Sequence, residues 1–202
     1  MGKQIIAVDA DDTLFDENNA IRLFHNERYG SAHSEDDYLA EGEFGWFWAP
    51  LWGTDQEETE RRYEEFIQFK LKSNLPPLPG ALEVLRSLQE RFELVVVTSR
   101  DERAVKVTHD ALTEHYPDVF TGVHFAPVWS SDKKMTKAAI CNEIGAAYLI
   151  DDAYHHCQLA AQSGVTALLF GEYGWNRTQE LVAGMVRCKD WQAVKEYFDA
   201  QG

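Results

Sequence analysis

The segment that most constrains this chain is a short apolar run that ends in three carboxylates. Residues 5–8 are apolar and rich in β-branched side chains, which is typical of a buried strand. Asp9, Asp11 and Asp12 follow within four residues. Open α/β sheets bind ligands at the carboxyl ends of their strands, and a divalent cation would offset the repulsion among these acids. An acidic turn that caps the next helix explains the same residues equally well.

Composition limits the classes of function. The 202 residues suffice for one full domain and a sizeable insertion. A net charge of −15 argues against duplex nucleic acid or a membrane surface as partner, but not against a small phosphorylated substrate. The three cysteines show no disulfide or metal spacing, and the sequence contains no secretory or membrane-spanning apolar run. We therefore expect a cytoplasmic protein.

Short apolar runs alternate with helical patterns along most of the chain. Strands are predicted at residues 5–8, 92–97, 123–125, 147–150 and 166–170. Helices are predicted at residues 81–88, 102–114, 136–144 and 156–162, and over the tail from residue 178 onwards. This alternation is typical of an α/β fold with a doubly wound parallel sheet.

Residues 16–74 break the alternation. They contain no convincing strand, a long charged helical pattern over residues 57–72 and a concentration of aromatic side chains. We predict a core of residues 1–15 and 75–202, and a helical cap of residues 16–74 over the carboxyl edge of the sheet. The aromatic residues, Trp46 and Trp48 among them, could stack on a substrate, but most are expected to pack within the cap itself.

Polar side chains follow three of the predicted strands, namely Asp9 and Asp11, Thr98 and Ser99, and Asp151 and Asp152. Each pair alone is common turn chemistry. In a parallel sheet, however, all three strand ends lie at one edge. The sequence therefore predicts that carboxylates from distant parts of the chain meet beside a hydroxyl.

The order of these residues resembles the motifs of the haloacid dehalogenase (HAD) superfamily of phosphotransferases. Residues 9–13 resemble its DxDxT first motif, and residues 95–98 resemble its second. Lys137 stands where the third-motif lysine is expected, and residues 149–152 resemble the fourth motif. Within the superfamily, residues 79–99 and the Trp-Asn-Arg of residues 175–177 are similar to segments of the 5′(3′)-deoxyribonucleotidase family. The resemblance implies a Rossmann-like core with a cap inserted after the first strand.

The resemblance also implies roles for individual residues. Asp9 would be the nucleophile and form an aspartyl-phosphate, and Asp11 would be the acid and base. Mg²⁺ would bind the Asp9 carboxylate, the Asp11 backbone carbonyl and Asp152, with Asp151 as a further metal-side carboxylate. Phosphate binding is implied for three residues, Thr98, Ser99 and Lys137, although Lys133 and Lys134 are close enough in sequence to take the lysine role. Asp12 and the pair His155 and His156 are interpreted as structural.

These roles describe a Mg²⁺-dependent phosphomonoester hydrolase, which we expect to act on nucleoside or deoxynucleoside monophosphates. The acid at position 11 favours phosphoryl transfer over carbon–halogen cleavage, since dehalogenases of the superfamily lack an acid there. Three alternatives remain open. They are a phosphatase for another small metabolite such as a sugar phosphate, a phosphomutase, and a non-catalytic protein that uses the aromatic cap as a docking surface.

Overall fold

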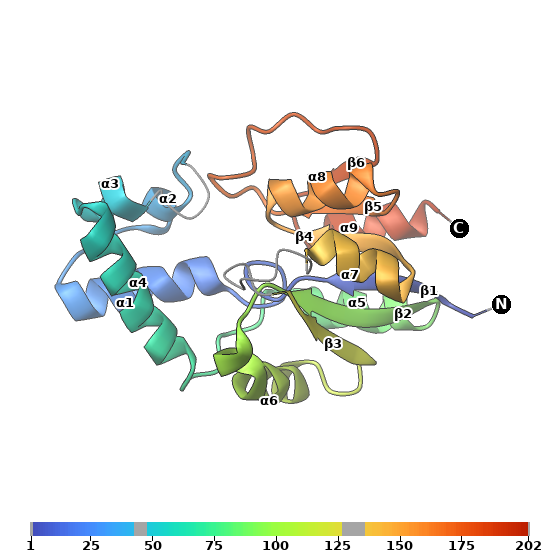
Figure 1. Cartoon of the computed structure of the whole chain (residues 1–202), viewed down its shortest axis with the longest axis horizontal. Coiled ribbons are helices and arrows are strands. Elements are labelled where there is room, and N and C mark those ends of the chain that lie inside the picture. Colours follow the sequence, from blue (N-terminus) through green and yellow to red (C-terminus); the bar gives the residue numbers. More distant parts are fainter. Residues whose placement is uncertain (1, 43–47, 127–135, 202) are drawn as a thin grey trace.

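The computed structural model describes residues 2–42, 48–126 and 136–201. Six parallel strands form one sheet in the order β3-β2-β1-β4-β5-β6 (Figure 1). The strands are β1 (Gln4–Val8), β2 (Phe92–Thr98), β3 (Gly122–Phe125), β4 (Ala146–Asp151), β5 (Thr166–Phe170) and β6 (Met185–Cys188). The chain starts in the middle of the sheet and winds outward in both directions, which confirms the predicted fold class.

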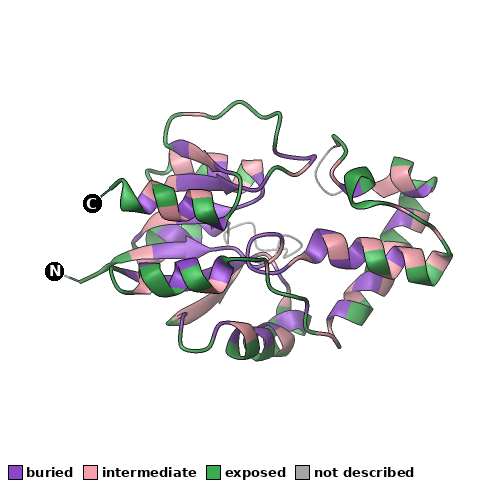
Figure 2. Cartoon of the chain, turned by 180° about the vertical axis from the view of Figure 1, so that it is seen from behind, coloured by how far each residue is buried: buried purple, intermediate pink, exposed green. Residues whose placement is uncertain are grey.

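Helices cover both faces of the sheet because the strands are apolar on both sides. The helices of this unit are α5 (Ala81–Gln89), η1 (Glu102–Ala104), α6 (Val105–His115), α7 (Lys137–Ile144), α8 (Tyr154–Gln162) and α9 (Trp191–Asp199). In β1, Ile6 and Val8 face the hydrophobic cluster that includes α5, α6 and α9. Ala7 between them faces the cluster of α7 and α8. This two-residue alternation sandwiches the sheet between helices (Figure 2).

Helix α7 shows how the sequence sets an element boundary. The Thr136 hydroxyl accepts a hydrogen bond from the Ala139 N–H at 3.1 Å and caps the amino end. Gly145 ends the helix in the left-handed conformation, with φ of 71°. Both boundaries were predicted, and they place Lys137 in the first turn of the helix.

The tail of the chain differs from its prediction as one continuous helical region. A loop leads to β6, which pairs with β5 at the edge of the sheet, and only α9 beyond it is helical. The strand has four residues and includes Arg187, whose guanidinium donates to the Asn176 and Gln179 carbonyls. A strand this short and mixed in composition carries too weak an alternation to be read from sequence.

Residues 16–74, which we call the cap region, lie beside the carboxyl edge of the sheet (Figure 1). Their helices are α1 (Glu17–Tyr29), α2 (Glu35–Tyr38), α3 (Trp48–Trp52) and α4 (Gln56–Lys70). The described part of the region contains helices and no strand. Buried Ile21, Trp52 and Phe66 join the same hydrophobic cluster as β1 and β2, so the cap region packs continuously onto the core.

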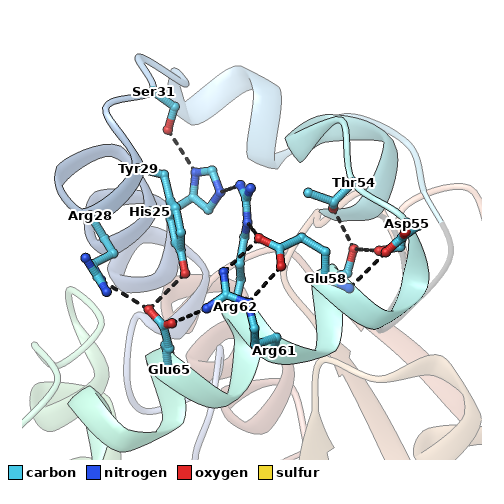
Figure 3. Close-up of polar contacts among 11 residues, drawn as sticks. His25, Arg28, Tyr29, Ser31, Thr54, Asp55, Glu58, Arg61, Arg62 and Glu65 are labelled. Atoms are coloured by element: carbon cyan, nitrogen blue, oxygen red, sulfur yellow. Dashed lines mark hydrogen bonds and ion pairs between the residues drawn. The ribbon is translucent and has the colours of Figure 1, made fainter.

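A buried histidine joins helices α1 and α4 within the cap region (Figure 3). His25 lies 2.8 Å from the Ser31 hydroxyl through Nδ1 and 3.1 Å from an Arg62 nitrogen through Nε2. Because a guanidinium can only donate, Nε2 must accept and the imidazole must be neutral. Burial and the neighbouring Arg62 lower the pKa of His25 to about 4. The ring also stacks on Trp52 at 4.5 Å between centroids.

Candidate active site

The carboxyl ends of the two central strands bring three acids together. Asp9 directly follows β1, and Asp151 and Asp152 stand at the end of β4. The Asp9 N–H donates to the Ile150 carbonyl at 2.9 Å, which fixes the two strand ends side by side. All three carboxyl groups are buried, and one oxygen of each lies within 4.8 Å of the others. The meeting of these strand ends is the arrangement that the sequence predicted.

Lys137 reaches this acidic group from the first turn of α7. Its Nζ lies 2.6 Å from an Asp9 oxygen and 2.7 Å from an Asp151 oxygen, and its side chain is 2% exposed. Burial lowers the pKa of a lysine, but here the two carboxylates outweigh burial and raise it. Lys137 is therefore a fixed positive charge. The other candidate lysines, Lys133 and Lys134, lie outside the described residues.

The three acids carry more negative charge than one lysine can offset. Burial raises the pKa of Asp9 to about 7, opposed by Lys137 and assisted by Asp151 and Asp11. Burial and Asp151 also raise the pKa of Asp152 well above its ordinary value. Such values show that the site favours an additional positive charge. A compact set of carboxylate oxygens suits a hard divalent cation, so these residues fit Mg²⁺.

The loop that follows β5 holds Asp152 in place. The Trp175 indole N–H donates to one carboxylate oxygen of Asp152 at 2.8 Å. The Asn176 side-chain amide donates to the backbone carbonyls of Asp152 and Phe170, both at 2.8 Å. Trp175 and Asn176 were noted in the sequence only as part of a family resemblance. Their contact with Asp152 spans more than twenty residues and carries no local sequence signal.

Asp11 lies in a different environment from the one that the sequence suggested. Its carboxylate accepts from the Arg100 guanidinium, with Nη2 2.5 Å from Oδ1 and Nε 3.0 Å from Oδ2. The Lys70 ammonium, from the end of α4, lies 2.9 Å from Oδ2 and 2.6 Å from Glu17. Although burial raises it, the pKa of Asp11 is held well below its ordinary value by Arg100 and Lys70. Asp11 is thus an ionised carboxylate at the junction of core and cap region.

The Asp11 side chain is not part of the group of three acids among the described residues. Its predicted role as acid and base, and its predicted metal contact through the backbone carbonyl, stay predictions. The sequence analysis missed Arg100, Lys70 and Glu17. Arg100 directly follows the residues that end β2, and this position was the one available signal. Lys70 had none, because a lysine at the end of a charged helix is usually solvated.

Asp12 has the structural role expected of it. Its backbone adopts the left-handed conformation with φ of 54°, which aspartate tolerates better than most residues. Its carboxylate accepts from the Asn18 N–H at 2.8 Å, at the start of α1. Each of the two interpretations of the acidic segment therefore applies to a different residue. Asp12 supports the next helix, and Asp9 joins the acidic group.

The hydroxyl residues lie at the end of β2, which is paired with β1. Thr98 is 1% exposed, and its Oγ1 accepts from the Arg100 N–H at 3.2 Å. The Ser99 hydroxyl lies 3.4 Å from His156 Nε2, and the His156 ring contacts that of His155 at an interplanar angle of 44° near the start of α8. Thr98 ends the strand next to β1, and Ser99 directly follows it. Their contact with phosphate stays a prediction.

The predicted aromatic substrate contacts are in the cap region. Trp46 lies outside the described residues. Trp48 begins α3, is half-buried, and stacks on Tyr63 at 5.1 Å and on Trp52 at 5.8 Å between ring centroids. These contacts favour packing within the cap region, and binding of substrate by Trp48 stays a prediction.

The fold is shared with solved structures of HAD proteins. A protein assigned as a phosphoglycolate phosphatase from Lactobacillus delbrueckii subsp. bulgaricus is 17% identical, with a TM-score of 0.65 and 98% coverage of both chains. A haloacid dehalogenase-like hydrolase from Streptococcus pneumoniae is 15% identical, with a TM-score of 0.63 and coverage of 97% of this chain and 98% of that one. A structure described as a HAD hydrolase from Bacillus subtilis bound to magnesium is 14% identical, with a TM-score of 0.61 and coverage of 98% and 100%. The TM-scores show a shared fold, but sequence identities this low do not show a shared substrate.

Comparison with models of sequence families identifies the family of this chain more specifically than the solved structures do. Comparison with curated proteins finds no match. The family model described as "5′ nucleotidase, deoxy (Pyrimidine), cytosolic type C protein" matches residues 3–201. In the part of the chain that the structure describes, no helix has the length and apolar character to cross a bilayer. The chain therefore belongs to the family of cytosolic type C 5′ nucleotidases, and its fold is that of HAD-family hydrolases.

Proposed function

We propose that this protein is a Mg²⁺-dependent phosphomonoester hydrolase that acts on nucleoside or deoxynucleoside monophosphates in the cytoplasm. The observation that carries the chemistry is the group of Asp9, Asp151 and Asp152 with Lys137 buried among them. The preference for nucleotides is supported by the family model, which covers nearly the whole chain.

Asp9 acts as the nucleophile. Lys137 holds Oδ1 of its carboxylate, which leaves Oδ2 for attack on phosphorus. An oxygen–phosphorus bond forms to Asp9 as the ester bond of the substrate breaks, and the departing oxygen takes up a proton. Water then attacks the phosphorus of this aspartyl-phosphate. Inorganic phosphate leaves and the free carboxylate is restored.

The acidic group would hold Mg²⁺ through Asp9 and Asp152, with Asp151 beside them. When bound, Mg²⁺ supplies positive charge against the phosphate oxygens as negative charge builds up on them. The Bacillus subtilis relative is described with magnesium bound, which supports this choice of ion. Thr98 and Ser99, at the end of the neighbouring strand, donate hydrogen bonds to the same oxygens, and Lys137 adds a fixed positive charge.

Asp11 transfers the protons in this scheme. It gives a proton to the departing oxygen and later takes one from the attacking water. In the present arrangement both of its oxygens accept from cations, Arg100 and Lys70. Its carboxyl group must therefore separate from at least one of these two before it can carry a proton to the substrate.

The test is release of inorganic phosphate from a panel of nucleoside monophosphates, deoxynucleoside monophosphates and sugar phosphates. We expect hydrolysis that prefers the nucleotides, stops on addition of EDTA and returns with Mg²⁺. Asp9→Asn should lose about a thousandfold or more in kcat while keeping its circular dichroism spectrum. Asp110→Asn, on the exposed side of α6, is the matched control and should keep full activity.

Each part of the proposal has an outcome that contradicts it. Equal or better hydrolysis of sugar phosphates would refute the substrate class and leave the hydrolase chemistry standing. Substantial turnover by a folded Asp9→Asn variant would refute the assignment of the nucleophile. Full activity in EDTA would refute dependence on Mg²⁺.

A further inference from the structure

A single loop after β5 contacts both the acidic group and the cap region. We propose that Gly174 in this loop is the residue on which the cap region docks, and that Trp175 beside it is the positioning residue for the Asp152 carboxylate. The inference rests on the proposed function in one respect, since it takes Asp152 to bind a cation. Figure 1 shows this loop extending from β5 toward α2.

The first observation is the contact of Trp175 with Asp152. The buried indole donates to Oδ2 at 2.8 Å, which fixes the rotation of the carboxylate and leaves Oδ1 for another partner. The ring is itself held, because it stacks on Tyr173 at 4.7 Å with an interplanar angle of 1°. The Tyr173 hydroxyl donates to the Asp12 carbonyl at 2.9 Å. The loop thus connects the segment after β1 with the segment after β4.

The second observation is the absence of space at Gly174. A Cβ atom at this position would lie 1.8 Å from the Ala40 carbonyl oxygen and 3.2 Å from the Leu39 oxygen. Both are backbone atoms just after α2 in the cap region, so no side-chain rotation can make room. The Gly174 carbonyl accepts from the Gly42 N–H at 3.3 Å. Here the backbones of core and cap region are in direct contact.

The glycine is required by this contact and not by its own conformation. Gly174 is not among the glycines with positive φ, so alanine would fit the local backbone. A side chain at position 174 would instead disturb the packing of the cap region on the core. Gly174 and Trp175 are adjacent in the sequence. The cap region therefore contacts the core at the residue next to the one whose side chain orients Asp152.

Trp175→Phe tests the positioning role, since it removes the N–H and keeps a ring to stack on Tyr173. The readout is the Mg²⁺ concentration that gives half of the maximal thermal stabilisation, measured without substrate. Loss of a hydrogen bond to a metal ligand should raise this concentration 10- to 100-fold. Trp191→Phe is the matched control, because its buried indole donates to the Thr13 carbonyl at 2.9 Å. It should lower the melting temperature but leave the Mg²⁺ midpoint unchanged.

Gly174→Ala tests the docking role. We expect faster hydrogen–deuterium exchange in the peptide that covers residues 38–42, and a fall of tenfold or more in kcat/KM. The Mg²⁺ midpoint should remain within twofold of the wild type. Gly122→Ala is the matched control, since the nearest atom to its new Cβ would be 3.6 Å away. Exchange in residues 38–42 and kcat/KM should be unaffected there.

The outcomes separate this inference from the proposed function. An unchanged Mg²⁺ midpoint in Trp175→Phe would overturn the positioning role. Unchanged exchange in Gly174→Ala would overturn the docking role. Both readouts are independent of substrate, so they decide the inference even if no phosphomonoester is hydrolysed. Absence of hydrolysis by the wild type, with both readouts as expected, would refute the proposed function alone.

Discussion

Replacing Lys137 with methionine removes the ammonium group that lies between two buried carboxylates and keeps most of the side-chain volume. Asp9 and Asp151, 2.6 and 2.7 Å from the ammonium, would then face each other and Asp152 without it. In the wild type, burial raises the pKa of Asp151, but Lys137, His156 and the Ala153 N–H together outweigh burial and lower it. Without the lysine, burial dominates, so the site must bind at least one proton more than in the wild type, where the pKa values of Asp9 and Asp152 are already raised.

Two estimates of the cost agree. Removing one partner of a buried ion pair costs about 3–5 kcal/mol of unfolding free energy. Protonating a carboxyl group with an ordinary pKa of 3.8 at pH 7 costs about 4 kcal/mol, at about 1.4 kcal/mol per pH unit. The folded variant binds a proton that the unfolded chain releases, so its stability falls as pH rises. We therefore expect a deficit of about 4 kcal/mol at pH 7 that shrinks toward pH 5.

The assay is urea denaturation of Lys137→Met and wild type at pH 5 and pH 7, in EDTA and with Mg²⁺. Because a cation can replace the missing charge, Mg²⁺ at 100 times its dissociation constant should restore about 2.7 kcal/mol at pH 7. Lys195→Met is the control, since Lys195 forms an exposed ion pair with Asp199 on α9. It should cost about 0.5 kcal/mol or less at either pH.

A deficit in Lys137→Met as small as that of the control would refute this account of the buried charges. So would a deficit that is independent of pH, because proton uptake is the source of the predicted slope. If Mg²⁺ stabilised neither protein, the three acids would not form a cation site.

Two further predictions concern the cap region. The pKa of His25 is lowered to about 4 from an ordinary 6.5, so the unfolded chain binds its proton first. Stability should therefore fall by about 1–3 kcal/mol as pH drops from 6.5 to 4, and His25→Gln should lose this component while the exposed control His109→Gln keeps it. Lys70→Met should cost about 3–5 kcal/mol in urea denaturation, because it leaves half-buried Asp11 and buried Glu17 without their shared cation. Its control Lys72→Met, exposed just beyond the same helix, should cost less than about 0.5 kcal/mol, and equal losses in the two variants would contradict the reasoning.

The sequence predicted five of the six strands of this sheet, the edge strand β3 among them, and missed β6 at the opposite edge. The inner strands are buried on both faces, so each appears as an unbroken apolar run. The edge strand β6 is only four residues long, and its two buried ends flank two half-buried positions. Nothing in so short a segment distinguishes it from the start of the helix that follows.

The residues of the site also fall into two groups, those that the sequence predicted and those that it did not. Asp9, Asp151 and Thr98 follow or end predicted strands, so topology alone brings them to one edge of the sheet. Arg100 meets Asp11 across 89 positions, and Lys70 meets Glu17 across 53. Such pairs depend on how segments distant in the sequence pack together, which no local pattern records.

Neighbouring residues can also have unrelated environments. Asp9, Asp11 and Asp12 form one acidic segment in the sequence, yet they face the acidic group, two cations and a helix start respectively. Their side chains point in different directions because they lie in a tight turn. Helical or strand periodicity cannot predict those directions. The resemblance to HAD motifs distinguished Asp9 from Asp12, whereas composition could not.

The inner position of β1 and β4 has a consequence for the order in which this protein opens. Strands with neighbours on both sides exchange their amide hydrogens only when the whole sheet separates. Asp9, Asp151 and Asp152 are anchored there, whereas the cap region meets the core through Lys70, the contact at Gly174 and the apolar side chains of Ile21, Trp52 and Phe66. Local separation of the cap region from the core should thus occur many times for each unfolding of the sheet that separates the three acids.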